Sequence, residues 1–245
     1  MTKYAYPDSG ADLPRRCPRA DRMPHALRMN ARHPLLRYFL DAAEGRFPAA
    51  DGAVTTVLAL ADGLECVVAF TGHAVVATAL SAAQVAAEKP DGYGGAMAPD
   101  FLRALAGPGG DIGVLDVTLV GRGTGGAVAL AALTGADDHP RVAYARARRA
   151  NVRVYGDERG LVTLAEGVAG RPELSIELHP RTTHGRGSGR SLIRAARTLV
   201  PRGEPVFAAV SPGNARSLRA FLAAEFVPVG SEVLIRPDRA AGVVG

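Results

Sequence analysis

Hydrophobic and polar positions recur at regular spacings only after residue 34. Residues 1–34 contain many Pro, Arg and Asp residues with little periodicity, which is typical of a flexible tail or of an arm that packs on a surface. Beyond this tail, the pattern predicts helices over 35–43, 82–87 and 99–105, and strands over 54–60, 66–70 and 74–78. The segment Gly107-Pro108-Gly109-Gly110 then ends the last helix and is the best candidate for a domain boundary.

The pattern changes after residue 110. It predicts strands over 112–120, 152–155, 161–168, 174–178 and 205–210, helices over 137–149, 189–199 and 215–224, and two final strands or one bent strand within 227–235. This order forms a mixed sheet with helices on both faces, so the fold class is α/β in the broad sense, an α+β mixed sheet. We therefore divide the chain into the tail (1–34), a smaller N-terminal α+β part (35–110) and a larger C-terminal domain (111–236).

Composition narrows the choice of partners. The chain has 245 residues, 47% of them hydrophobic, which is enough for a real core, but only 5% aromatic with no Trp. Its net charge of +5 is carried almost entirely by Arg, which fits a nucleic acid, an anionic ligand or a simple coding bias. The Arg residues are interleaved with acids and few aromatic rings are present for base stacking, so nucleic acid is not indicated.

The cysteines, histidines and apolar runs indicate neither a metal site nor a membrane segment. Cys17 and Cys66 lie far apart and the six His residues are scattered, so we expect no metal site, and Cys66 is read as a small core residue. No apolar run reaches the roughly 18 residues of a membrane span, and the N-terminus lacks the apolar segment of a signal peptide. We expect a cytoplasmic protein that does not contact membranes.

One glycine-rich segment stands out, at 184–190 between a predicted strand and a predicted helix. Its backbone can approach a ligand closely, and the helix behind it presents free N–H groups, a combination that suits a phosphate. A phosphate loop of the NTPase kind needs Gly-Lys-Ser/Thr, whereas this chain has Gly189-Arg190-Ser191. The spacing of Gly185, Gly187 and Gly189 also differs from the dinucleotide fingerprint. A second glycine-rich segment, 121–126, also lacks the Lys and is read as a flexible connection.

These residues carry a resemblance. The run from His184 to Leu192, preceded by Leu178-His179-Pro180, resembles the acyl-CoA-binding motif of the GCN5-related N-acetyltransferases (GNAT). Asn214-Ala215-Arg216-Ser217-Leu218 is similar to the second motif of that family, and Phe226 lies where the family has the Phe of a Gly-Phe pair. The resemblance covers about residues 111–236 and implies a GNAT-like acyltransferase fold for this part.

The resemblance also implies roles by position. Acetyl-CoA would be the co-substrate, and the loop residues would hold its pyrophosphate through their backbone N–H groups: His184, Gly185, Arg186, Gly187, Ser188, Gly189 and Arg190. The strand residues Ile176, Glu177 and Leu178 would pair with the pantetheine arm like an added strand, and Asn214 would hydrogen-bond near it. The side chains of Arg186 and Arg190 either reach phosphates or are solvated loop charges.

Three positions depart from the family pattern. His184 replaces the usual Arg or Gln, and Glu225 replaces the Gly of the Gly-Phe pair. Phe221 lies seven residues after Asn214, where the family commonly has a Tyr that acts as general acid. Since Phe221 cannot donate a proton, the thiolate of CoA must be protonated by another group or by water, or the chain does not catalyse the reaction.

A general base must take the proton of an incoming ammonium group. Glu173 and Glu177 are the candidate catalytic residues, because strand alternation puts both on one face of the sheet with Ser175 between them. Either can instead be an ordinary solvent-facing strand residue. Glu166, Tyr155 and His179 are further possibilities.

The sequence thus predicts an N-acetyltransferase that moves an acetyl or other acyl group from acyl-CoA to an amine by direct attack. The alternative is a catalytically degenerate CoA-binding or ligand-sensing module, which Phe221 favours. Residues 35–110 would cover the acceptor side or form a degenerate second copy of the fold. The acceptor, a small-molecule or peptide amine, is not named by the sequence, and a homodimer remains open.

Overall fold

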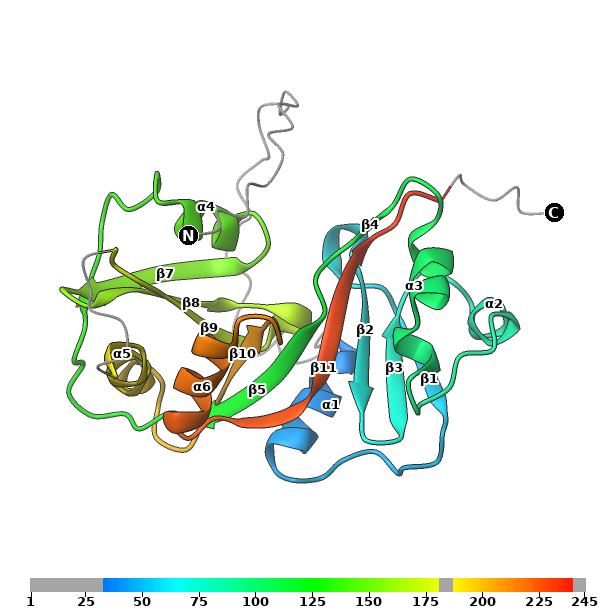
Figure 1. The fold of residues 1–245 in the computed structure, drawn as a ribbon, viewed down its shortest axis with the longest axis horizontal. Helices are drawn as coiled ribbons and strands as arrows, with labels where there is room; N and C mark the ends of the chain where they lie inside the picture. The colour runs from blue at the N-terminus through cyan, green and yellow to red at the C-terminus, as the bar shows by residue number, and fades with distance from the viewer. Residues whose placement is uncertain (1–32, 181–186, 240–245) are drawn as a thin grey trace, which may run out of the picture. The chain divides into compact units, whose positions relative to one another are not determined.

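The computed structural model describes residues 33–180 and 187–239, which share one sheet of eleven strands (Figure 1). Its order is β1 (Val54–Val57), β3 (His73–Ala77), β2 (Glu65–Phe70), β11 (Val227–Arg236), β5 (Asp116–Arg122), β10 (Pro205–Val210), β9 (Pro172–Leu178), β8 (Gly160–Glu166), β7 (Ala150–Asp157) and β6 (Ala131–Ala132). A short β4 (Asp111–Ile112) pairs with β11 outside this path. Among the strands of the described residues, only the pairs β1–β3 and β9–β10 are parallel, so the expected mixed α/β fold is confirmed.

Helices cover both faces of the sheet. On one face lie α1 (Pro34–Ala43) and α4 (Pro140–Arg146), and on the other lie α2 (Ala82–Ala87), α3 (Pro99–Ala106), α5 (Ser188–Ala196) and α6 (Ala215–Ala223). The alternation of β10 shows this division, because Phe207 packs with α1 whereas its neighbours Val206 and Ala208 pack with α5 and α6. We call the face under α1 and α4 the α1 face.

Local sequence explains where several helices begin. His33 caps α1, since its ring accepts a hydrogen bond from the Leu35 N–H at 3.1 Å, and Pro34 is placed in the first turn. Ser81 and Gln84 form a capping box at the start of α2. These two helices match their predicted ranges to within one residue.

Strand β11 joins the two parts of the chain. It pairs with β2 along one edge and with β5 along the other, and Figure 1 shows it between them. It is a single strand with a register shift between Pro228 and Gly230. Gly230 passes so close to β2 that a Cβ there would lie 2.5 Å from the Ala69 carbonyl oxygen. The strands that precede and follow the glycine–proline segment at 107–110 in the sequence therefore belong to one continuous sheet. The division of the chain into two parts stays a prediction.

Several predicted segments differ from the structure, and among them the strand expected over 54–60 ends at Val57 as β1. The strand expected over 112–120 is divided into β4 and β5, and the helix expected over 137–149 is reduced to α4, which His139 caps. The glycine-rich segment at 121–126 is not a flexible connection: Gly123 and Gly125 donate to the carbonyls of Glu204 and Val200 at 2.8 and 3.0 Å. Long-range backbone pairing, which local patterns do not show, decides the strand and the glycine-rich segment, whereas the local cap at His139 and Pro140 set the start of α4.

Candidate functional site

Strands β9 and β10 separate from each other towards their C-terminal ends. They are joined by a single registered pair, Phe207 with Glu173. Beyond it, β9 continues to Leu178 and β10 to Val210 with no further pair between them in these fully described strands. The result is a wedge in the sheet, and the edge of β9 inside it offers peptide groups to an extended ligand.

Helix α5 begins at the open end of this wedge. Gly187 precedes it with φ +79°, a left-handed conformation that favours glycine. A Cβ on Gly189 would lie 3.3 Å from the Cβ of Ala220 in α6, and 3.9 and 4.0 Å from Leu178 and Ile176 of β9. The first turn of α5 therefore lies directly against the end of β9, with its N–H groups and positive dipole end beside the wedge.

The separated ends of β9 and β10, with α5 starting beside them, have the arrangement that the resemblance to the GNAT family implies for this part of the chain. Within it, the structure brings together two sets of the predicted binding residues: the end of β9 (Ile176, Glu177, Leu178) and the start of α5 (Gly187, Ser188, Gly189, Arg190). Asn214 caps α6 just beyond β10, where its Oδ1 accepts from the Ser217 N–H at 3.1 Å. The predicted residues His184, Gly185 and Arg186 lie outside the described residues.

Glu173, one of the two predicted catalytic carboxylates, is buried between two arginines. Its Oε1 lies 2.5 Å from Arg149 Nη2, and its Oε2 lies 3.1 Å from Arg171 Nη2. Burial raises the pKa of Glu173, but Arg171 and Arg149 outweigh burial and hold the pKa below its usual range. Glu173 is therefore an ionised partner of two cations whose oxygens already accept hydrogen bonds.

Arg171 is the centre of this buried network. It is fully buried and donates to both oxygens of Glu232, at 2.6 and 2.7 Å, while Thr118 donates to Glu232 Oε2 at 2.6 Å. Its guanidinium carbon lies 4.3 Å from the ring centroid of Phe39, so α1 covers it. The network thus ties the turn before β9 to β11, and it lies on the α1 face.

Glu177, the other predicted catalytic carboxylate, is half-exposed at the open end of the wedge. Its Oε2 accepts from Arg141 Nε of α4 at 3.1 Å. Between the two glutamates, the Ser175 hydroxyl lies 2.6 Å from the Thr163 hydroxyl and 3.3 Å from Arg149 Nη1. The expected placement of Glu173, Ser175 and Glu177 on one face is confirmed, and that face is the α1 face.

Asp116 is a further carboxylate of this face that the sequence analysis missed. It begins β5, its Cα partner on β11 is Glu232, and it is half-buried. Burial raises its pKa to about 6, with the carboxylates of Glu232 and Glu173 adding to the rise. Asp116 and Glu232 are over a hundred positions apart in the sequence, and no local pattern indicates that β5 and β11 pair.

The two other departures from the family pattern have clear structural roles. Phe221 is buried in α6 and packs edge-on against Phe226, with ring centroids 5.0 Å apart. Glu225 has φ +66°, a conformation that suits the glycine of the family better than a side chain. Its carboxylate is held by Arg197 Nη1 at 2.6 Å, an ion pair that offsets part of this backbone cost.

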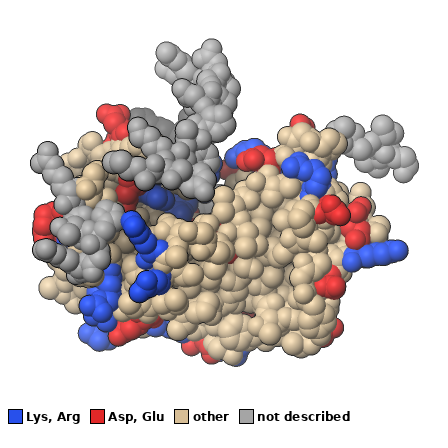
Figure 2. Space-filling view, viewed as in Figure 1, with Lys and Arg blue, Asp and Glu red and all other residues tan. Residues whose placement is uncertain are grey.

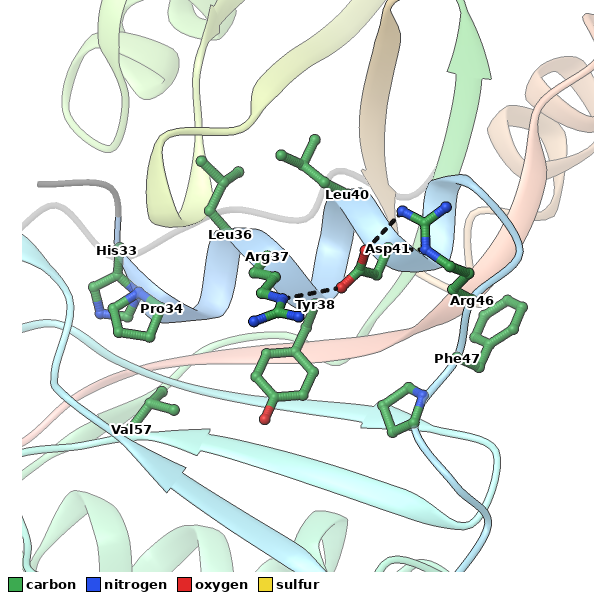
Figure 3. A pocket seen from close by; sticks show the side chains of 11 residues that line it. His33, Pro34, Leu36, Arg37, Tyr38, Leu40, Asp41, Arg46, Phe47 and Val57 are labelled. Atoms are coloured by element: carbon green, nitrogen blue, oxygen red, sulfur yellow. Dashed lines mark hydrogen bonds and ion pairs between the residues drawn. The ribbon is translucent and has the colours of Figure 1, made fainter. Parts of the chain in front are cut away.

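Two pockets lie away from the wedge. One, of about 940 Å³, runs along α1 and contains Asp41, which accepts from Arg37 and Arg46 (Figure 3). The other, of about 640 Å³, includes Pro172 and Pro205, the first residues of β9 and β10, and so lies at the opposite end of these strands from the wedge. Neither contains the residues that carry the resemblance.

The described residues have surface charges of both signs. On the face drawn in Figure 2, basic and acidic side chains of the described residues are interspersed. No group of three or more His, Cys, Asp or Glu residues in the described ranges is arranged to hold a metal ion. Cys66 is fully buried, as expected of a core residue. Across 33–180 and 187–239, no helix has the length and apolarity needed to cross a membrane.

Comparison with known proteins gives similarity to solved structures alone, since no family model and no curated protein matches. A proposed GNAT-family acetyltransferase from Novosphingobium aromaticivorans is 16% identical with a TM-score of 0.39, over 54% of this chain and 69% of that one. A GNAT-family acetyltransferase from Colwellia psychrerythraea is 9% identical with a TM-score of 0.34, over 52% and 57%. A conserved protein of unknown function from Staphylococcus epidermidis is 14% identical with a TM-score of 0.37, over 58% and 68%.

Proposed function

We propose that the chain is an acyltransferase that moves an acetyl or similar acyl group from acyl-CoA to an amine. The observation that carries this proposal is the wedge between β9 and β10 with α5 starting at its open end. An extended pantetheine arm can pair with the unpaired edge of β9, and the first turn of α5 provides N–H groups for the pyrophosphate. The coenzyme supplies a thioester, whose carbonyl a backbone N–H of β9 would polarise.

The reaction itself is a direct transfer. The neutral amine attacks the thioester carbonyl, a C–N bond forms, and the C–S bond breaks to release the CoA thiolate. The proton of the ammonium goes to a base of the α1 face, where Glu177, Glu173 and Asp116 lie. Because Phe221 has no acidic proton and is buried, the thiolate takes its proton from solvent.

A pair of variants at Gly189 tests the coenzyme site. Gly189→Asp adds a negative charge to the first turn of α5, so we expect it to weaken CoA binding at least tenfold in calorimetry, because charge repulsion adds to a steric clash. Gly189→Ala is the matched control, since it adds the same Cβ, 3.3 Å from Ala220, without the charge. We expect a much smaller effect from Gly189→Ala. Unchanged CoA affinity in a folded Gly189→Asp protein would show that the site lies elsewhere.

A second candidate function is a CoA-binding or ligand-sensing module without catalysis, which Phe221 in the usual position of the acid favours. Incubation with acetyl-CoA and a panel of amines, followed by measurement of free thiol, separates the two functions. Release of thiol that depends on the amine supports the transferase. Tight CoA binding with no release for any amine supports the binding module.

We propose that residues 35–110 contribute to the acceptor side rather than to coenzyme binding. Phe39 of α1 covers the guanidinium of Arg171, and α1 lies on the face that carries the site carboxylates. The described residues of this part do not contact the start of α5 through any hydrogen bond or ion pair. Substitutions in α1 are therefore expected to change the use of amines more than the affinity for CoA.

A further inference from the structure

We propose that Asp116 is the catalytic base that takes the proton from the acceptor amine, a role that rests on the transferase function proposed above. Neither the glycine-rich motif nor the Asn214 motif includes this residue. The inference comes from where the pairing of β5 places its side chain and from the partners that the neighbouring carboxylates already have.

The sheet register places Asp116 at the open end of the wedge. Along β10, Ala209 pairs with Thr118 and Val210 with Val117, so the next residue of β5, Asp116, lies beside the point where β10 ends. Adjacent strands are about 4.8 Å apart, so β10 is the only strand between Asp116 and the wedge. On the other side of the wedge, Glu177 occupies the end of β9.

The side chain of Asp116 lies on the α1 face. Strand residues two positions apart point to the same side, and Thr118 donates from this face to Glu232 at 2.6 Å. Asp116 and Glu177 therefore flank the open wedge on the face that carries the polar network. An amine entering from this face meets both carboxylates before it reaches the edge of β9.

The other carboxylates of this face already have strong partners. Glu173 accepts from Arg149 and Arg171, and Glu232 accepts from Arg171 and Thr118. Glu177 is paired with Arg141. Asp116 is the carboxylate of this group with no hydrogen bond or ion pair to another described residue, so its oxygens are free to accept a proton.

The charges around Asp116 suit a base that works near neutral pH. Glu232 on β11 and Glu173 on β9 oppose its ionisation, whereas Arg171, before β9, and Arg149, before β7, favour it. The Cys66 thiol of β2, which interacts with Glu232 and Arg171, stays protonated because burial raises its pKa. Burial and the two carboxylates outweigh the arginines and raise the pKa of Asp116 to about 6. A base with a pKa near the working pH combines a free lone pair with useful proton affinity.

The step balances with one base. The ammonium transfers one proton to an Asp116 oxygen, the neutral nitrogen attacks the thioester carbonyl, and the thiolate leaves with the electron pair of the C–S bond. Asp116 then returns its proton to solvent. The step needs no oxidant and no co-reactant besides acyl-CoA and the amine.

The first test measures Asp116 directly. Carbon-13 NMR of the side-chain carboxyls is recorded against pH for the CoA-bound protein, and the Asp116 signal is the one missing in Asp116→Asn. We expect this signal to titrate near pH 6. Titration at or below the ordinary value of 3.8 would overturn the proposal.

The second test is kinetic and uses a primary alkylamine such as butylamine as probe, with acetyl-CoA. In wild type, kcat/KM should decrease as the pH is lowered through about 6. In Asp116→Asn this pH dependence should be absent, and the rate at pH 7.5 should be lower by about 100-fold or more. CoA affinity should stay within about twofold in calorimetry. Hydroxylamine, which is already neutral at that pH, should lose far less rate than butylamine.

Two further variants complete the test. Glu177→Gln tests the rival base: if it abolishes the decrease of kcat/KM at low pH while Asp116→Asn retains that decrease, Glu177 is the base and this proposal fails. Glu88→Gln removes an exposed charge after α2 and controls for non-specific effects.

A wild-type protein that binds CoA but transfers to no amine would overturn the transferase function, and with it the role of Asp116. If Asp116→Asn turns over with the same pH profile of kcat/KM as wild type, the role of Asp116 is overturned and the transferase function stands.

Discussion

The raised pKa of Asp116 lowers the free energy of unfolding at neutral pH. Because its pKa rises from 3.8 to about 6 in the fold, the folded state favours the protonated form. The stabilisation that this gives is fully present below pH 3.8 and is lost as the pH rises through about 6. A carboxylate kept in such surroundings destabilises the fold at neutral pH, which is typical of functional positions.

The variant Asp116→Asn should therefore be more stable than wild type above pH 7. The gain should be about 1–2 kcal/mol after discounting for solvent screening of a half-exposed group. At pH 4 most of the gain should disappear, since Asp116 is then mostly protonated in the fold and only partly ionised in the unfolded chain. Urea denaturation at pH 8 and pH 4 measures both values, and an equal effect at the two pH values would contradict the raised pKa.

In contrast to Asp116, Arg171 stabilises the folded protein. Arg171→Met would leave Glu173 and Glu232 buried without their shared cation, which should cost about 3–5 kcal/mol. The double variant Arg171→Met/Glu232→Gln should recover part of this loss, because one buried charge is removed. Thermal unfolding of the three proteins provides the measurement. A loss below 1 kcal/mol for Arg171→Met would show that the network is not needed for stability.

At the scale of elements, α5 and α6 act as one layer over the wedge. Figure 1 shows the two helices side by side, and Gly189 of α5 lies against Ala220 of α6. Small residues at this contact let the start of α5 come close to the end of β9. The proposed coenzyme site would thus depend on helix packing as well as on the glycine-rich segment.

Phe221, at the position where the resemblance implies an acid, is a buried packing residue. Phe221→Ala should cost about 3–5 kcal/mol, because a buried ring and its contact with Phe226 are lost. Turnover per folded molecule should change far less. Calorimetric melting and thiol release, measured on the same samples, separate the two effects. A protein with normal melting and lost turnover would contradict this role.

At the scale of the whole molecule, β11 makes one sheet from the two parts of the chain. Its edges are both used, by β2 and by β5. Beyond its end, Arg239 pairs with the buried carboxylate of Glu65 in β2. The parts therefore share a sheet and an ion pair rather than a simple linker.

A protein limited to residues 111–245 should not fold stably on its own. It would expose the edge of β11 that β2 covers, together with the apolar residues under α1 and α3. We expect aggregation, or unfolding at a much lower denaturant concentration than the full chain, in expression and urea experiments. A soluble and cooperatively folded fragment would instead support an independent domain at 111–236.

The sequence by itself determined the local elements, and it predicted the segments of the proposed coenzyme site. Helices α1 and α2 and strand β10 lie within one residue of their predicted ranges, because caps, prolines and short-range periodicity specify them. The glycine-rich motif likewise depends on neighbours in the chain. Only the tertiary structure decided that Glu173 is buried between arginines and that Asp116 lies beside Glu232. These facts follow from strand pairing across more than a hundred residues, which hydrophobic patterns along one segment do not encode.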